Sequence, residues 1–364
     1  MQCSRLAWCR MDEFARRNDD DRLAFINEAA ARRDVAPIVI EKDFWVCWTL
    51  RRLMSVPVLA ENLTFKGGTS LSKAYGIIER FSEDIDLTIR RNAPMIVDTL
   101  PPMEDDISGK ERERRREALK AAAQRYVKEI ALPALSKAMA EALGTSNGWS
   151  VGIDPMDRDA QTIFFKYPKL LVYSHSAWGY SWGNSWGDAW GKVGYIRPRI
   201  KLEFGARGET NPAEFKAITP YLAQEYPEEL PDATVNVPTL SVQRTFWEKI
   251  MILHALYHGR KLRPEISRHY YDIMMLAQKG IDDAAMKTPE LLANVAHNSN
   301  LMFADKKASY DTATLGSLRL VPTEDLRERL RADYAAMSEM FITPPPSFDE
   351  LMAAISALEK KLNG

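Results

Sequence analysis

The chain has 364 residues, of which 46% are hydrophobic and 27% are charged. This length supports a large core and predicts roughly two or three domains, or one large domain with helical additions. A formal net charge of −1 excludes an indiscriminate coat on nucleic acid, so any contact with a polyanion such as RNA has to be local.

The composition also bears on the compartment. No apolar run approaches the roughly 18 residues that span a bilayer, and the N-terminus is charged where a signal peptide is apolar. The three cysteines, Cys3, Cys9 and Cys47, are odd in number and lack the spacing of a zinc or redox motif. These features predict a cytoplasmic protein without a membrane partner.

The first part of the chain alternates between helical and strand-like patterns. Apolar residues recur at helical spacing over residues 12–54, which predicts two helices, with Pro37 in the first turn of the second. Residues 63–66 are predicted as a short strand that leads into a Gly-Gly pair. A helix is predicted over residues 71–79, and a second strand over residues 85–89.

The rest of the sequence predicts a loop, a long helix, two strands and a helical region. Residues 92–109 hold three prolines and several acids, which indicates a loop. Residues 110–143 are predicted as a long charged helix; its charges are typical of a solvated face, with RNA contact as the alternative. Strands are predicted at 164–172 and 196–204, and helical periodicity dominates from residue 239.

A tract of four tryptophans interrupts this pattern. Trp178, Trp182, Trp186 and Trp190 recur every four residues, each followed by glycine, which opposes a stable helix and predicts a loop or irregular hairpin. Two interpretations stay open: a variable insertion packed on the surface, and an aromatic surface that stacks on bases.

Two aspartates form the clearest candidate site. Asp84 and Asp86 are separated by one residue, so on a strand both carboxylates point to one face while Ile85 and Leu87 point to the other. Adjacent acids repel each other unless a cation lies between them, and hard divalent cations bind carboxylate and phosphate oxygens together. A solvated edge strand is the alternative interpretation.

The glycine pair upstream strengthens this prediction. Gly67 and Gly68 lie between a strand and a helix, where glycine lets backbone N–H groups approach phosphate. Thr69 and Ser70 follow, and either hydroxyl can cap the helix and donate to a triphosphate. The two motifs together predict binding of a nucleoside triphosphate on metal.

Later segments supply further candidates. Alternation over residues 200–204 places Lys201 and Glu203 on one strand face, where Glu203 can complete the carboxylate set or activate an attacking hydroxyl, and Lys201 can neutralise phosphate charge. Lys249 projects from an apolar helix as a candidate triphosphate ligand. Arg268 and Asp272 lie one turn apart, where they pair with each other or brace Lys249.

These motifs together resemble the AbiEii toxin family, nucleotidyltransferases of the DNA polymerase beta-like superfamily. The resemblance runs from about Met11 to the C-terminal helices and includes Leu318-Arg-Leu-Val-Pro322. It rests on five ordered motifs: Gly67-Gly68-Thr69-Ser70-Leu-Ser-Lys73, Arg80-Phe-Ser82-Glu-Asp84-Ile-Asp86-Leu87, Lys201-Leu-Glu203, Phe246-Trp-Glu-Lys249 and Arg268-His-Tyr-Tyr-Asp272.

The resemblance implies an α+β fold. A polymerase beta-like nucleotidyltransferase core, a mixed sheet flanked by helices, is expected over residues 61–205. N-terminal helices of residues 1–60 pack on this core, and a mainly helical C-terminal domain occupies residues 206–364.

The resemblance also implies roles for the motif residues. The expected metal ligands are Asp84, Asp86 and Glu203, although the wider superfamily more often has Asp in the third place. The expected catalytic residues add Lys201, Lys249 and Asp272 to these three acids. The expected nucleotide-binding residues are Gly67, Gly68, Thr69, Ser70, Lys73, Arg80 and Ser82.

The implied function is that of a bacterial toxin in a toxin–antitoxin or phage-defence operon. Related MenT toxins transfer nucleotides to the 3′ end of tRNA, so the expected reaction moves NMP from an NTP to an RNA acceptor with Mg²⁺ or Mn²⁺. The expected partner is an antitoxin, a winged-helix regulator. Alternatives are transfer to a protein or small-molecule hydroxyl, and an NTP-binding interaction protein without catalysis.

Overall fold

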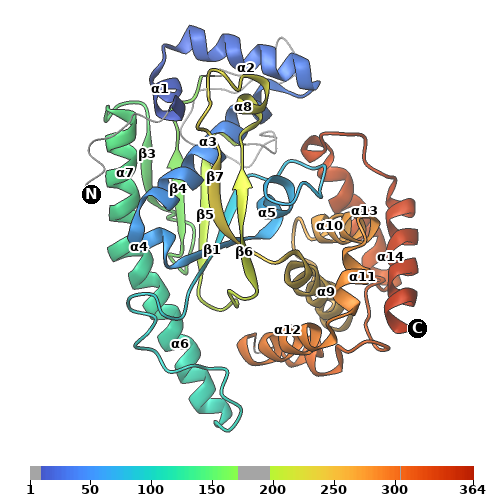
Figure 1. The fold of residues 1–364 in the computed structure, drawn as a ribbon. Coiled ribbons are helices and arrows are strands. Elements are labelled where there is room, and N and C mark those ends of the chain that lie inside the picture. Colours follow the sequence, from blue (N-terminus) through green and yellow to red (C-terminus); the bar gives the residue numbers. More distant parts are fainter. Residues whose placement is uncertain (1–9, 171–196, 304) are drawn as a thin grey trace.

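The computed structural model describes residues 10–170, 197–303 and 305–364. A seven-stranded mixed sheet forms the centre of one half of the molecule, and a group of helices forms the other half (Figure 1). We refer to residues 10–240 as the sheet unit and to residues 242–363 as the helical unit. The tryptophan tract lies outside the described residues.

The strands follow the order β3-β4-β5-β2-β1-β7-β6 across the sheet. Strand β2 lies at its centre, antiparallel to β1 and parallel to β5. The strands are β1 (Leu63–Lys66), β2 (Asp84–Ile89), β3 (Ser150–Ile153), β4 (Thr162–Lys166), β5 (Ile200–Gly205), β6 (Ala213–Ile218) and β7 (Val235–Leu240).

Two strands of the sheet lie in the range for which a mainly helical domain was expected. Strand β7 pairs in parallel with β1, and β6 pairs antiparallel with β7, so the sheet continues to residue 240. The alternation of buried and exposed side chains is weak in β6, where most side chains are exposed. Strand β7 contains Pro238, a residue that argues against a strand in the sequence. A mainly helical domain was expected from residue 206, and these two strands belong to the sheet within that range. The division of the chain into domains stays a prediction.

The N-terminal region forms three main helices where two were predicted. A break at residues 17 and 18 separates the first two, because the Asn18 side chain accepts a hydrogen bond from the Asp21 N–H and starts a new helix there. Pro37 begins the third, as predicted. The helices are α1 (Arg10–Arg16), α2 (Asp19–Arg33), α3 (Pro37–Ser55) and the short α4 (Pro57–Ala60).

Helix α5 (Gly67–Lys73) begins at the glycine pair itself and ends before residue 79. The long charged helix is confirmed as a continuous helical run with a π-helical segment, Val127–Ala131, in its middle. The remaining helices are α6 (Gly109–Tyr126), α7 (Leu132–Leu143), α8 (Tyr221–Glu225), α9 (Val242–Gly259), α10 (Ser267–Gln278), α11 (Ile281–Met286), α12 (Pro289–Met302), α13 (Glu324–Ala336) and α14 (Phe348–Asn363).

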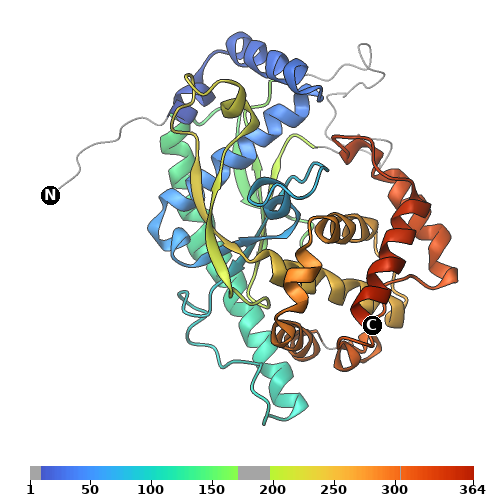
Figure 2. The same cartoon turned by 45° about the vertical axis from the view of Figure 1, so that its right-hand side comes forward.

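The two units have separate hydrophobic cores. The first lies between the sheet and helices α1–α3, α6 and α7, and includes Trp45 and Trp48. The second lies within the helical unit, and α5 with the segment after it contributes Leu71, Ile77 and Ile78 to it. Helix α5 also contacts β1 and β2, so it connects the sheet to the helical unit (Figures 1 and 2).

A buried ion pair holds α5 to α3. The Lys73 Nζ lies 2.6 Å from an Asp43 carboxylate oxygen, and the two side chains are 6% and 2% exposed. The same carboxylate accepts a hydrogen bond from the Tyr221 N–H at 2.6 Å, and the Lys73 ammonium lies over the Tyr221 ring. The ammonium predicted to contact nucleotide is thus already paired, and a contact through it would require breaking the pair.

Within the described ranges, no helix combines the length and the apolar character of a bilayer-spanning segment.

Removing Asp43 should destabilise the fold strongly. The substitution Asp43→Ala leaves the Lys73 ammonium buried without its anion, and we expect the free energy of unfolding to fall by about 3–5 kcal/mol in urea titrations. Glu328→Ala is the control, because Glu328 is 83% exposed in its pair with Arg331, and should change stability by less than about 1 kcal/mol. Equal effects of the two substitutions would contradict a buried ion pair at this position.

Candidate functional site

The acidic residues of β2 and β5 lie side by side at the centre of the sheet. Alternation on β2 buries Ile85 and Leu87 and leaves Asp84 and Asp86 partly accessible on the opposite face. In the parallel pairing with β5, Asp86 is the register partner of Glu203, and Asp84 of Lys201. Four of the predicted side chains therefore form one group.

The surroundings of this group disfavour the negative charge of Asp86. Burial, then the charges of Glu203 and Asp84, raise the pKa of Asp86 to about 8. Burial also disfavours the Glu203 charge, but hydrogen bonds from Asp86 and Lys201 outweigh it and lower the pKa of Glu203. These shifts favour the protonated form of Asp86, which can donate a hydrogen bond to the charged Glu203.

The glycine turn packs directly against the aspartate. Gly67 has a φ of +81°, and a Cβ built on it would lie only 1.8 Å from Asp86 Oδ2. A Cβ on Gly68 would lie 2.7 Å from Arg80 Nη2 and 2.8 Å from Ser82 Oγ. Both glycines are therefore needed for close approach, and Gly67 also for its backbone conformation.

The two hydroxyls after the glycines fix the turn internally. Thr69 and Ser70 are fully buried. The Thr69 hydroxyl donates to the Asp84 carbonyl and lies 2.9 Å from Ser82 Oγ, while the Ser70 hydroxyl donates to the Gly67 carbonyl at 2.8 Å. These bonds hold the turn and the start of β2 in one arrangement.

A second charged group joins this turn to the helical unit. Arg80 binds both Asp272 oxygens at 2.7 and 2.8 Å, and Lys249 donates to the same carboxylate at 2.8 Å. Although burial opposes its charge, Arg80 and then Lys249 hold the pKa of Asp272 far below its usual range. Asp272 pairs with Lys249, as one of its two predicted roles requires, and Arg80 is a further partner.

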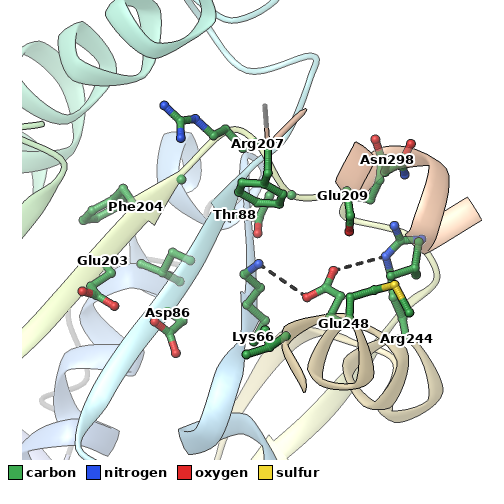
Figure 3. A pocket seen from close by; sticks show the side chains of 18 of the residues that line it. Lys66, Asp86, Thr88, Glu203, Phe204, Arg207, Glu209, Arg244, Glu248 and Asn298 are labelled. Carbon is green, nitrogen blue, oxygen red and sulfur yellow. Dashed lines mark ion pairs between the residues drawn. The ribbon is translucent and has the colours of Figure 1, made fainter. Parts of the chain in front are cut away.

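A cavity of about 370 Å³ adjoins Asp86 and Glu203 (Figure 3). We call it the central cavity. Its walls come from β1, β2 and β5 on one side and from α9 and α12 of the helical unit on the other. Across it, Glu248 of α9 lies 3.6 Å from Lys66 of β1, and on α9 itself Glu248 lies 3.4 Å from Arg244. Sequence reasoning missed Lys66, Arg244 and Glu248, although Lys66 directly precedes the glycines and Glu248 directly precedes Lys249.

The acidic group suits a divalent cation in its chemistry. Its donors are carboxylate oxygens, and the proton held by Asp86 marks a charge that a cation would neutralise instead. Over the described ranges, no three His, Cys, Asp or Glu side chains are arranged to hold a metal. Mg²⁺ bound through one or two carboxylates and substrate phosphates needs no such cluster, so Asp84 and Asp86 remain its expected ligands.

An acidic pair on a central strand, a third carboxylate beside it and a tight glycine turn define a site of the nucleotidyltransferase type. A model of the family described as nucleotidyl transferase AbiEii toxin, type IV toxin–antitoxin system, matches residues 48–354. The chain belongs to this AbiEii family and is a nucleotidyltransferase. The expected α+β fold with a mixed sheet is confirmed by the structure.

Comparison with other proteins adds little to this assignment. A search of curated proteins finds no match. Among solved structures, MenT4, a nucleotidyltransferase toxin from Mycobacterium tuberculosis H37Rv, is 15% identical over 93% of this chain and 99% of its own, with a TM-score of 0.40.

Adding a methyl group at Gly67 should abolish activity. Gly67→Ala drives Cβ into Asp86, and displacement of a catalytic group by about 1 Å can lower rates by about 100-fold. We expect a loss of at least that size in the rate of labelled NMP transfer. Gly76→Ala is the matched control: Gly76 also has a positive φ, but a Cβ there meets nothing within 4 Å. Equal activity of the two variants would contradict the packing of Gly67 on Asp86.

Neutralising Asp86 should stabilise the metal-free protein at high pH. An unfolded Asp releases its proton near its usual pKa of 3.8, whereas folded Asp86 keeps it to about pH 8, so the wild type loses stability as pH rises between these values. Asp86→Asn carries no titrating proton and can still donate to Glu203. In urea titrations with EDTA, we expect a gain above about 1 kcal/mol at pH 8 that vanishes near pH 4. A gain independent of pH would refute the shared proton.

Proposed function

We propose that this enzyme transfers NMP from an NTP to an RNA hydroxyl, with Mg²⁺ or Mn²⁺, and that the acceptor is the 3′ end of tRNA. The observation that carries the proposal is the packing of Asp86 between Gly67 and Glu203, which concentrates acids beside the glycine turn. The acceptor rests on the resemblance to toxins that modify tRNA.

The acidic residues have different roles in the proposed reaction. Asp84 and Asp86 would hold the cation, which supplies charge neutralisation at the reacting phosphate when bound. Glu203, charged beside Asp86, accepts the proton of the attacking hydroxyl, whose oxygen bonds to the α-phosphorus while pyrophosphate leaves. Lys201, paired with Glu203, offsets the negative charge that develops there.

The turn and the second charged group would position the triphosphate. Arg80 and Lys249 carry two positive charges against the single negative charge of Asp272, which leaves one positive charge behind Gly68. Ser82 lies next to Gly68 and offers a hydroxyl on the same side. This arrangement favours an anion at the turn without a direct contact from either buried cation.

Membership in a toxin family also indicates the kind of protein partner to expect. A type IV system pairs the toxin with an antitoxin. We propose that a winged-helix regulator acts as this antitoxin and that both proteins act in the cytoplasm.

The transfer reaction can be tested directly. The protein is incubated with each α-labelled NTP, total tRNA and Mg²⁺, and labelled tRNA is resolved on a gel. We expect label in tRNA from the wild type, at least about 100-fold less from Asp86→Ala, and none with EDTA. Asp20→Ala, which removes an exposed acid of α2, serves as the control and should keep wild-type activity.

The products also decide between acceptors. Label in protein or in small molecules, found by mass spectrometry with tRNA unlabelled, would replace RNA as the acceptor and keep the reaction. Absence of metal-dependent label from every fraction would refute the proposal.

A further inference from the structure

Strand β6 forms one edge of the sheet and is exposed along most of its length (Figure 1). In the described part of the chain, β7 is the one strand that pairs with it. Phe215, in the middle of β6, is 73% exposed, and among the large hydrophobic side chains exposed in the described ranges it is the only one in a strand. An open edge with an exposed aromatic side chain is a surface on which another strand can pair.

The backbone groups of β6 alternate between β7 and the open edge, as in any antiparallel pair. The Ser241 N–H donates to the Pro212 carbonyl at 2.9 Å, so Pro212 and every second residue after it face β7. Pro238 fits this alternation, because it has no N–H and lies opposite Phe215, whose own backbone groups face outward. The outward-facing N–H and C=O groups therefore belong to Ala213, Phe215 and Ala217. Within the described residues, no backbone group from outside the sheet bonds to them.

Two opposite charges lie on one face of β6, and Phe215 lies on the other face. The Glu214 carboxylate and the Lys216 ammonium are 3.1 Å apart. Tyr75 contacts both of them, since its hydroxyl lies 3.2 Å from Glu214 Oε1 and the Lys216 ammonium lies 4.7 Å from the centre of its ring. The Glu214 side chain is still 52% exposed. The edge therefore presents an acid and a base two residues apart, in a fixed order along the strand.

A second β6 strand that runs antiparallel matches this order when the two Phe215 residues lie opposite each other. Each Glu214 then faces the Lys216 of the other copy in the closer, non-hydrogen-bonded type of pair, and the outward N–H and C=O groups of the two strands meet. The two phenyl rings lie together on the other face. In a register shifted by two residues, the backbone groups still meet, but Glu214 faces Glu214 or Lys216 faces Lys216, which is destabilising. The register centred on Phe215 therefore satisfies both the backbone and the charges.

The charge pattern favours a second copy of this chain over a different protein. A lysine on an edge strand usually opposes pairing between copies, because the same charge meets itself in the neighbouring molecule. In β6, Glu214 removes this repulsion for one register. An unrelated strand would need a base and an acid in the matching order, whereas a second copy has them by symmetry, because a two-fold axis exchanges the two positions.

We infer that two copies of this chain associate through β6, in an antiparallel pair centred on Phe215, with reciprocal ion pairs between Glu214 and Lys216. The sheet then continues from one copy into the other. The contact consists of two short strands and their side chains, so it buries a small area and forms a reversible monomer–dimer equilibrium. None of its residues belongs to the acidic group or to the glycine turn, so the inference does not depend on the proposed function.

Sedimentation velocity of the full chain over a dilution series measures this equilibrium directly. We expect dimers at high concentration that dissociate on dilution. Glu214→Lys places lysines opposite each other, and Lys216→Glu places acids opposite each other, so each should raise the dissociation constant at least about tenfold. The double variant Glu214→Lys/Lys216→Glu restores opposite charges and should return the constant to within about threefold of the wild type. Glu228→Lys makes the same charge change at an exposed acid outside β6 and should leave the constant unchanged.

Amide hydrogen exchange tests the backbone pairing. In peptides that cover β6, exchange of the wild type should slow as the protein concentration rises, whereas exchange of Glu214→Lys should not depend on concentration. Peptides that cover β3, the opposite edge of the sheet, serve as the reference and should not respond. The inference is overturned if the wild type stays monomeric at every concentration, if the single charge reversals leave the dimer intact, or if the double variant does not regain it.

Discussion

The site depends on one close contact, that of the Asp86 carboxylate with Gly67. No other residue fits there, because a Cβ would overlap the carboxylate oxygen and because φ is positive. The contact sets where β1 ends and α5 begins, and α5 in turn contacts both the sheet and the helical core. The position of the glycine turn relative to the acids therefore follows from the absence of a side chain at Gly67.

The acidic residues around Asp86 destabilise the folded protein. Burial and mutual repulsion raise the pKa of Asp86, so the charged form of this carboxylate is unfavourable in the folded protein. Other buried charges near the site are paired and therefore less costly. Asp272 forms ion pairs with Arg80 and Lys249, and Asp43 forms one with Lys73.

Sequence patterns predicted the parts of the site that are local. Alternation fixes the faces of β2 and β5, and therefore the direction of Asp86 and Glu203, because successive side chains of a strand point to opposite faces. Such patterns could not predict pairings between distant segments. Examples are the addition of β7 to β1, the ion pair of Lys73 with Asp43 and the contacts of Lys66. Each depends on which elements pack together, and the same local pattern is compatible with several partners.

Helix α9 connects the two ends of the site. Glu248 and Lys249 are adjacent on it, so their side chains point about 100° apart around the helix axis. Glu248 faces Lys66 across the central cavity, whereas Lys249 reaches Asp272 and through it Arg80, beside the glycine turn. One rigid helix thus sets both the cavity wall and the charge behind the turn.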